Sequence, residues 1–210
     1  MLTIHHLVLS RSDRVVWLAE ELGLKYELVR HERNAETFRS PDSLWKVSPM
    51  GKAPVIHDDG VVLAESGAIV EYLIDKYGQG RLRPRPGTPE YLAYLHWMHA
   101  AESTLMVPIL LEALCTLTQT NSPGLSGFGE GEYSTVFKYL NQCLEKAPFV
   151  AGQELTGADI MVTYCLRLST GQAIPIMKGK PPLEKNPAIR SYLARIEARP
   201  AFKKSVELCK

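Results

Sequence analysis

Three short stretches of this sequence carry side chains that could do chemistry. Ser10 follows an apolar, strand-like run and stands just ahead of a helical pattern. Glu65 and Ser66 open a second helical pattern, where unpaired backbone N–H groups and the positive end of the helix dipole favour a carboxylate ligand. Pro54 stands at the start of the apolar run Val55-Ile56. A proline is tolerated there because the first residue of a strand does not need its N–H for the sheet. Together they provide a hydroxyl, a prolyl turn and an acid–hydroxyl pair.

A hydroxyl just ahead of a helix can activate a bound thiol. A free thiol with a pKa of about 8.5 is only about 3% ionised at neutral pH, and lowering that pKa by two units requires about 2.7 kcal/mol. A charge-assisted hydrogen bond contributes about 1.5–3 kcal/mol, so one hydroxyl and a helix N-terminus are sufficient. Ser10 could instead be a plain N-cap, although Ser12 or Asp13 can also cap. Ser12 stays the rival hydroxyl for the thiol.

Other chemistries have less support. His5 and His6 share a strand and should point to opposite faces of a sheet. His96 and His99 share a helix face but lack a third ligand at useful spacing, so packing or solvent exposure is favoured over a metal site. Ser10 has no G-x-S-x-G elbow around it. The chain has four widely spaced cysteines that form no C-x-x-C pair: Cys115, Cys143, Cys165 and Cys209. We expect them to be reduced residues of a cytosolic protein. We therefore expect no metal.

Composition and charge exclude further classes. The chain has 210 residues and 24 Lys and Arg against 23 Asp and Glu, a net charge of +1 that gives no global reason to bind nucleic acid or an anionic membrane. The start of the chain lacks an export signal, and apolar runs such as 106–111 are far short of the ~20 residues of a membrane span. We expect a cytoplasmic protein with no nucleic-acid and no membrane partner.

The first part of the chain should form a mixed sheet with helices. The run 2–9 is β-like, and apolar residues at helical spacing follow it before a second strand at 26–30. Such a β-α-β unit usually closes as a right-handed parallel crossover. Ser40-Pro41 signals a short helix with the proline at its first position.

The stretch that carries Pro54 and Glu65 continues this pattern. Strands at 54–57 and 61–63 flank an Asp-Gly turn, the strongest short-range hairpin signal. A helix at 66–77 follows and ends before Gly78. The full order, β-α-β-α-β-β-α, predicts an α/β domain.

The second half of the chain is predicted to be helical after a linker. Arginines between prolines in the linker could contact nucleic acid, but a solvated linker is the favoured interpretation. A long helix from Thr88-Pro89 should kink at Pro108. The segment 120–132 is predicted to be a loop because it is rich in Gly and Ser. Its glycines could suggest a phosphate cradle, but a mobile connection is favoured because no strand precedes them and no Lys-Ser/Thr follows. Thr156 and Asp159 form a capping pair, which is favoured over a catalytic acid at Asp159.

These motifs, in this order, resemble the glutathione S-transferase family over essentially the whole chain. The resemblance rests on 10–18 (SRSDRVVWL), 20–24 (EELGL), 49–55 (PMGKAPV), 63–69 (LAESGAI), 149–152 (FVAG), Thr156-x-x-Asp159 and Tyr192-x-x-Arg195-x-x-x-Arg199-Pro200-Ala201. Each fragment is moderately specific, whereas the ordered set is very specific. The resemblance implies an α/β thioredoxin-like N-terminal domain at 1–78, a linker at 79–88 and an all-α C-terminal domain at 89–210. Members usually form homodimers, with the site at the domain junction.

The resemblance also implies roles for the residues that could do chemistry. Ser10 matches the hydroxyl that donates to the sulfur of glutathione, the co-substrate. The backbone of Ala53 would pair with the cysteinyl amide of glutathione. This requires a cis bond before Pro54, and that assignment rests on the resemblance because only about 5–6% of X-Pro bonds are cis. Glu65 would meet the γ-glutamyl amino group and Ser66 its carboxylate.

Other positions follow from the same resemblance. Lys52 and Arg11 are secondary candidates for the remaining carboxylate of glutathione. The pocket for the second substrate should be lined from the long helix after the linker, from the loop after Leu9 and from residues 173–177. The helix residues predicted there are equally credible as core positions: Tyr94, Met98, Glu102 and Met106.

The sequence thus predicts a serine-type glutathione transferase similar to bacterial and fungal enzymes with an SRSxR turn. Its expected reaction is conjugation of glutathione to small hydrophobic electrophiles, a detoxification reaction, with reduction of organic hydroperoxides by the same thiolate as a further activity. Isomerase and dehalogenase activities stay open. The alternative of another class is a non-catalytic family member that acts as a scaffold or regulatory binding protein.

Overall fold

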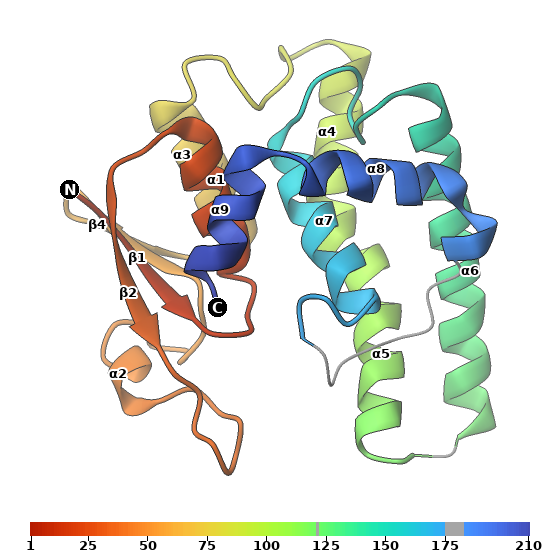
Figure 1. The fold of residues 1–210 in the computed structure, drawn as a ribbon, viewed down its shortest axis with the longest axis horizontal. Helices are drawn as coiled ribbons and strands as arrows, with labels where there is room; N and C mark the ends of the chain where they lie inside the picture. Colours follow the sequence, from red (N-terminus) through yellow and green to blue (C-terminus); the bar gives the residue numbers. More distant parts are fainter. Residues whose placement is uncertain (121, 175–182) are drawn as a thin grey trace. The chain divides into compact units, whose positions relative to one another are not determined.

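The computed structural model describes residues 1–120, 122–174 and 183–210. The chain divides into two compact units. One comprises Met1–Gly80 together with Ala198–Lys210, and the other comprises Arg81–Glu197. The first unit contains the sheet, and the described residues of the second are mainly helical (Figure 1).

A four-stranded mixed sheet in the order β2-β1-β3-β4 forms the centre of the first unit. Strand β1 (Leu2–Leu7) pairs in parallel with β2 (Tyr26–His31), and α1 (Asp13–Leu22) connects the two. Strand β3 (Val55–Asp58) is antiparallel to both β1 and β4 (Val61–Ala64). The predicted β-α-β unit and Asp-Gly hairpin are therefore confirmed.

Helices cover both faces of this sheet. Helix α3 (Ser66–Tyr77) packs against α1, and α2 (Asp42–Trp45) precedes β3. His6 on β1 contacts Ser12 just before α1, whereas His5 contacts His31, which in turn bonds to Ser43 of α2. Because successive side chains of a strand point to opposite faces, α1 and α2 lie on opposite sides of the sheet. The prediction for the two histidines is confirmed.

Helix α2 begins one residue later than predicted. Pro41 occupies the N-cap position, with φ −77° and ψ 163°, and not the first helical position. This extended backbone places Asp42 in the first turn, where a carboxylate suits the helix dipole.

The C-terminal helix α9 (Pro200–Leu208) packs along α1 in the first unit (Figure 1). The rings of Trp17 and Phe202 meet edge to face with centroids 5.0 Å apart. Arg199 Nε and Nη2 each donate to a carboxylate oxygen of Glu21 at 2.7 Å. This grouping differs from the division by sequence, which placed 89–210 in one domain, because the apolar side of α9 is buried on α1.

The second unit begins with a continuous helical run. Helix α4 (Pro89–Ala100) passes through the π-helical turn Ala101–Leu105 into α5 (Met106–Leu117). Pro108 has no N–H for the carbonyl four residues back, and its ring crowds that carbonyl, so a wide turn before it accommodates the proline. The sequence predicted a kink at Pro108, and the irregularity lies one turn earlier.

By length and composition alone, the run Pro89–Leu117 could cross a membrane. A single helix of this kind among the described residues is only weak evidence for a membrane-spanning segment, because core helices of soluble proteins can have the same length and composition. Within the second unit, α4 packs on α7 and α5 packs on α6. The sequence-based expectation considered uninterrupted apolar runs, which are shorter than this helical run.

Helix α6 (Pro123–Lys146) overturns one prediction, because the segment 120–132 was expected to be a loop. Pro123 is at the first helical position, where a proline costs little. Glycines lower helix propensity, but α6 packs on α5 and α8, and such tertiary packing outweighs propensity.

Three further helices complete the description: α7 (Gly157–Ser169), a short 3-10 turn at Leu183–Lys185, and α8 (Pro187–Glu197). The predicted capping pair opens α7. Asp159 accepts the backbone N–H and the hydroxyl of Thr156, each at 2.8 Å, and the N–H of Val150 at 2.9 Å. Capping is therefore the role of this fully buried carboxylate.

Candidate active site

The register of the sheet brings three parts of the site to one edge. Val55 on β3 pairs with His5 on β1 and with Ala64 on β4. Because β3 is antiparallel to both neighbours, the end of β1, the start of β3 and the end of β4 leave the sheet at the same edge. The turn with Ser10, the Ala53-Pro54 bond and the start of α3 therefore lie together.

The first turn contains two serines in different surroundings. Ser10 is 8% exposed, and its Oγ lies 2.7 Å from Ser12 Oγ and accepts the Ser12 N–H at 3.2 Å. Ser12 is 0% exposed, with its Oγ 2.8 Å from His6 Nδ1 and accepting the Leu7 N–H at 3.2 Å. The Ser12 hydroxyl is thus enclosed by protein partners, whereas Ser10 keeps some access to solvent.

Helix α1 starts without a cap from the side chain of its N-cap residue. Ser12 stands at the N-cap position, but its side chain makes no capping hydrogen bond. The backbone closes a tight turn instead, because the N–H of Asp13 donates to Ser10 O at 3.3 Å and the N–H of Arg14 donates to Arg11 O at 3.2 Å. Ser10 Oγ also accepts the Ser12 N–H at 3.2 Å, a contact of the capping type, so the capping interpretation of Ser10 stays open. Its hydroxyl lies beside a helix N-terminus.

Arg33 shapes the chain just before Ser10. Its Nε donates to Val8 O at 3.1 Å and its Nη2 to Leu9 O at 3.0 Å. Leu9 has φ +58°, a left-handed conformation that is uncommon outside glycine. Sequence reasoning did not identify Arg33, and no motif marks it.

The Ala53–Pro54 peptide bond is cis, as the resemblance implied. The preceding turn is fixed because Ser48 Oγ accepts the Lys52 N–H at 3.1 Å. Gly51 has φ +59°, and a Cβ there would lie 2.4 Å from Trp45 Cε2, so only glycine fits. Lys52 itself is exposed.

The start of α3 has no cap from the side chain of its N-cap residue. Glu65 occupies the N-cap position with φ +74°, is exposed, and provides no side-chain cap. The first backbone N–H groups of a helix without a cap are available to an anion. Ser66 is 3% exposed, and Arg14 Nη1 donates to its Oγ at 3.1 Å. Arg14, which the sequence did not identify as part of a site, thus links the two helix starts.

Histidines lie behind this edge on both faces of the sheet. Burial lowers the pKa of His5 to about 4, and positive charge on His57 or His31 would act in the same direction. Burial likewise lowers the pKa of His6 to about 4. Both rings are therefore neutral at neutral pH.

One group among the described residues has ligand atoms close enough for a metal ion. Atoms of His6, Asp13 and Cys209 lie within 4.8 Å of one another. His6 Nδ1 is already 2.8 Å from Ser12 Oγ, which favours hydrogen bonding over metal binding at that nitrogen. The absence of a metal stays a prediction.

The sequence matches two family models that together span both halves of the chain. Residues 4–82 match the glutathione S-transferase N-terminal domain, and residues 119–207 match the C-terminal domain. The chain belongs to the glutathione S-transferase family. Its edge site occupies the N-terminal family domain, and membership supports a glutathione-dependent enzyme in general.

Individual relatives agree with this assignment. Glutathione S-transferase 3 of Schizosaccharomyces pombe is 32% identical over 78% of this chain and 72% of its own. A crystal structure of a glutathione S-transferase from Actinobacillus pleuropneumoniae is 31% identical with a TM-score of 0.86, covering 100% of this chain and 93% of its own. The disulfide-bond oxidoreductase YfcG of Escherichia coli is 26% identical over 96% of this chain and 92% of its own. The family thus includes a relative named for another reaction.

The residues predicted for the second substrate lie in the helical unit of this transferase-family chain. Tyr94, Met98 and Met106 are buried, at 0%, 7% and 1% exposure, and Glu102 is half-buried. In the segment 173–177, the first two residues are buried and 175–177 lie outside the described residues. The substrate role of these positions stays a prediction.

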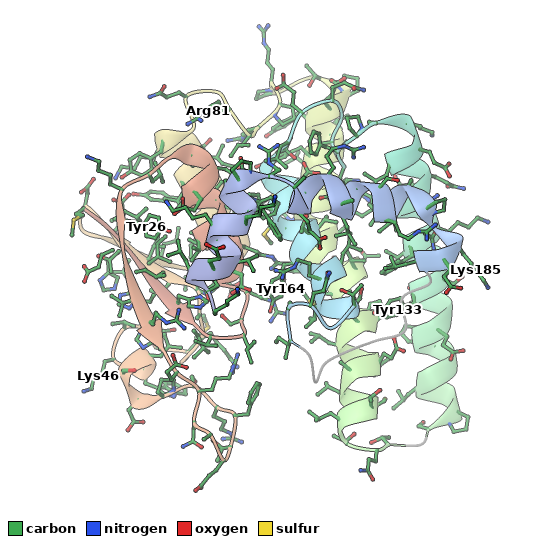
Figure 2. The ribbon with its side chains drawn as sticks, viewed as in Figure 1. Tyr26, Lys46, Arg81, Tyr133, Tyr164 and Lys185 are labelled. Carbon is green, nitrogen blue, oxygen red and sulfur yellow. The ribbon has the colours of Figure 1, made fainter. Side chains whose placement is uncertain are left out.

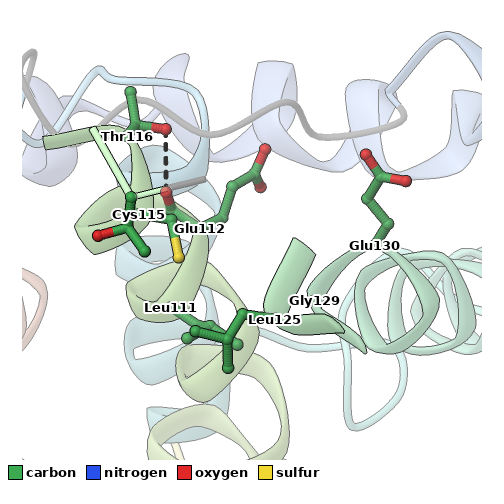
Figure 3. A pocket seen from close by; sticks show the side chains of 8 residues that line it. Leu111, Glu112, Cys115, Thr116, Leu125, Gly129 and Glu130 are labelled. Atoms are coloured by element: carbon green, nitrogen blue, oxygen red, sulfur yellow. Dashed lines mark hydrogen bonds between the residues drawn. The ribbon is translucent and has the colours of Figure 1, made fainter. Parts of the chain in front are cut away.

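A small cavity of about 170 Å³ lies between α5 and α6 (Figure 3). The residues predicted for the second substrate do not line it. Its walls are formed by Leu111, Glu112, Cys115, Thr116, Thr120, Leu125, Gly129 and Glu130. The cavity therefore gives no support to those four positions.

Proposed function

We propose that this protein is a serine-type glutathione transferase in which Ser10 donates a hydrogen bond to the sulfur of bound glutathione. The observation that carries the proposal is the meeting of Ser10, the cis Ala53–Pro54 bond and the start of α3 at one edge of the sheet. A hydroxyl and a helix N-terminus on one side of the sulfur favour the thiolate over the thiol.

The other residues of this edge hold the rest of the tripeptide. The backbone of Ala53 pairs with the cysteinyl amide. Glu65 binds the γ-glutamyl amino group, while Ser66 and the first N–H groups of α3 bind its carboxylate. The side chains of Lys52 and Arg11 bind the glycyl carboxylate.

The thiolate then attacks a small hydrophobic electrophile. A carbon–sulfur bond forms, and the leaving group departs with the electron pair of the bond that breaks. With an organic hydroperoxide, the thiolate attacks oxygen, the O–O bond breaks, and an alcohol leaves after taking a proton. The resulting sulfenic acid reacts with a second glutathione to give the disulfide and water.

The remaining parts of the proposal concern the whole protein. We infer a cytoplasmic homodimer whose helical unit supplies the electrophile pocket, with Tyr94, Met98, Glu102 and Met106 as lining candidates. A role in detoxification follows from the reactivity of such electrophiles. Membership of the family and the apolar character of these helices support this part.

Ser10→Ala tests the proposal. With chlorodinitrobenzene as electrophile, turnover should fall by about 10–100-fold, the loss of one charge-assisted hydrogen bond, while the dissociation constant of glutathione changes by less than about threefold. Ser191→Ala, which removes an exposed hydroxyl on α8, is the control and should keep full turnover. Unchanged turnover in Ser10→Ala would rule out the assigned role.

Disulfide reduction is the second candidate, because one relative is a disulfide-bond oxidoreductase. In the first unit Cys209 is the sole cysteine and is 8% exposed, so the reducing thiol would be that of glutathione. Assays of the same preparation with a model disulfide and with chlorodinitrobenzene separate the two reactions. Retention on a glutathione column without turnover in either assay would favour a non-catalytic binding protein, and no retention would favour a scaffold.

A further inference from the structure

Ser12 Oγ has four polar neighbours, which is more than one hydroxyl can bond at the same time. It lies 2.7 Å from Ser10 Oγ, 2.8 Å from His6 Nδ1, and 3.2 Å from both the N and the O of Leu7. A hydroxyl offers one hydrogen and two lone pairs. The Leu7 N–H can only donate, so it takes one lone pair. The state of His6 then decides how the other lone pair and the hydrogen are used.

His6 is 0% exposed and neutral at neutral pH, so one of its ring nitrogens carries a hydrogen and the other does not. Among the described residues, no partner lies in good hydrogen-bonding geometry at His6 Nε2, where only the backbone of Cys209 is near, whereas Nδ1 has Ser12 Oγ at 2.8 Å and Asp13 Oδ1 at 3.9 Å. A buried N–H in poor hydrogen-bonding geometry is more costly than an acceptor nitrogen in the same place. The hydrogen therefore belongs on Nδ1, which then donates to Ser12 Oγ.

This assignment fixes the direction of the remaining bonds. Both lone pairs of Ser12 Oγ are occupied, by the Leu7 N–H and by His6 Nδ1–H, so its hydrogen must point to an acceptor. Ser10 Oγ at 2.7 Å is closer than Leu7 O at 3.2 Å. Ser10 Oγ accepts this hydrogen and also the Ser12 N–H. Its two lone pairs are then used, and its own hydrogen is left to donate outward.

We propose that His6 and Ser12 are positioning residues that turn the Ser10 hydroxyl into a donor aimed at the substrate sulfur. The inference rests on the proposed function, because it assigns a task to the Ser10 hydrogen. A chain of aligned hydrogen bonds polarises each member, so His6 and Ser12 also strengthen the Ser10 donor. Neither residue touches the substrate in this account.

The opposite tautomer of His6 would reverse the chain. With its hydrogen on Nε2, directed at the backbone of Cys209, the Nδ1 atom would accept the Ser12 hydrogen. Ser12 Oγ could then accept from Ser10, and the Ser10 hydrogen would be lost to the sulfur. The two arrangements have the same heavy-atom distances and differ only in where the hydrogens lie.

The tautomer can be measured in the wild-type protein without any ligand. Long-range proton–nitrogen NMR correlations on isotope-labelled protein distinguish a hydrogen on Nδ1 from one on Nε2. We expect the Nδ1–H form for His6 over the range of about pH 6–8. The Nε2–H form would overturn the proposal. This measurement is independent of glutathione binding, so its failure is distinct from failure of the proposed function.

Variants test whether the chain acts on the thiol. The pKa of bound glutathione, followed by thiolate absorbance, should rise by about 0.5–1 unit in Ser12→Ala, which removes one of two donors to Ser10. In a Ser10→Ala background, the same change should add less than about 0.2 unit, because the path through Ser10 is gone. Equal shifts in both backgrounds would indicate a purely structural role and overturn the proposal.

His6 variants provide a second arm. His6→Asn keeps a donor near the Nδ1 position and should retain most of the thiol pKa shift, whereas His6→Leu should behave like Ser12→Ala. Ser205→Ala is the matched control, because it removes a buried hydroxyl from α9 whose bond is to Phe202 O. That control should leave the thiol pKa unchanged. A folded His6→Leu variant with the wild-type thiol pKa would contradict the proposal.

Discussion

At the scale of single residues, Ser10 and Ser12 are distinguished by their surroundings. Both are hydroxyls in one turn, and the sequence could not separate them fully because spacing does not reveal hydrogen-bond partners. In the structure Ser12 is fully buried against His6 and Leu7, while Ser10, at 8% exposure, keeps slightly more access to solvent. The more accessible hydroxyl suits contact with a ligand, and the fully buried one suits support of its neighbour.

Ser66 gives a prediction about affinity. Ser66→Ala removes the hydroxyl that we propose as a donor to the γ-glutamyl carboxylate, which should weaken glutathione binding by about 10–100-fold, as expected for one hydrogen bond to a charged group. Turnover at saturating glutathione should change little, because the contact is remote from the sulfur. Calorimetric titration and steady-state kinetics measure the two quantities. A large loss of turnover with unchanged affinity would contradict this role.

Arg14 should act on affinity through Ser66. Its Nη1 donates to Ser66 Oγ at 3.1 Å, so the Ser66 hydrogen stays available for a ligand. Arg14→Met should weaken glutathione binding by about 5–30-fold in the wild-type background and by much less in Ser66→Ala. Arg14→Lys, which keeps the charge, should fall between. Equal losses in both backgrounds would show that Arg14 acts elsewhere.

The sequence identified the residues that we propose to face a ligand, but not the residues that support them in the structure. Ser10, Glu65 and Ser66 occupy positions with recognisable local signals, a strand end or a helix start. Arg14 and Arg33 do not, because their partners are 52 and 24 to 25 residues away in the chain. Such contacts depend on the fold, which residue spacing cannot reconstruct.

At the scale of elements, β1 places two histidines inside the fold. Burial lowers the pKa of both His5 and His6 from 6.5 to about 4. Between these values the unfolded chain binds protons that the folded chain does not. Stability is therefore fully present above about pH 6.5 and is lost as the pH falls toward 4, by up to about 1.4 kcal/mol per pH unit for each histidine.

Urea unfolding at about pH 7, 6 and 5 measures this slope. His5→Leu should reduce the slope by about one histidine's contribution. His99→Gln, at an exposed position of α4, is the control and should leave it unchanged. The same free energy of unfolding at all three pH values in the wild type would contradict the burial of neutral histidines.

Element boundaries were predicted well where a local signal exists. The Asp-Gly hairpin, the end of α3 before Gly78 and the capping pair of α7 depend on short-range chemistry. Helix α6 was missed because its glycines mark a loop locally, whereas its helical state depends on packing against α5 and α8.

At the scale of the whole chain, the first unit is completed by its last residues. Helix α9 is far from α1 in sequence and packs on it. Glu20 of α1 also accepts a hydrogen bond at Oε1 from the hydroxyl of Tyr26, which is labelled in Figure 2, at 2.7 Å. Lys204 Nζ lies 2.8 Å from Glu20 Oε2. The boundary at residue 89 could not reveal this return, because composition shows a linker but not where a later helix packs.

Phe202→Ala should destabilise the first unit. The ring is 6% exposed and packs on Trp17, so its removal should lower the free energy of unfolding by about 3–5 kcal/mol. Lys204→Ala is the matched control on the same helix, because its side chain is 63% exposed and its ion pair should contribute less than about 1 kcal/mol. Urea unfolding followed by tryptophan fluorescence measures both. Similar small effects of the two variants would contradict the docking of α9.

The most direct test of the central claim is the pKa of the glutathione thiol bound to this protein. Thiolate absorbance measured against pH should give a value of about 6.5 in the wild type, about two units below that of the free thiol. In Ser10→Ala the value should return to within about one unit of 8.5, with glutathione still bound. A bound thiol with its ordinary pKa in the wild type, or an equally lowered pKa in Ser10→Ala, would contradict activation of glutathione by Ser10.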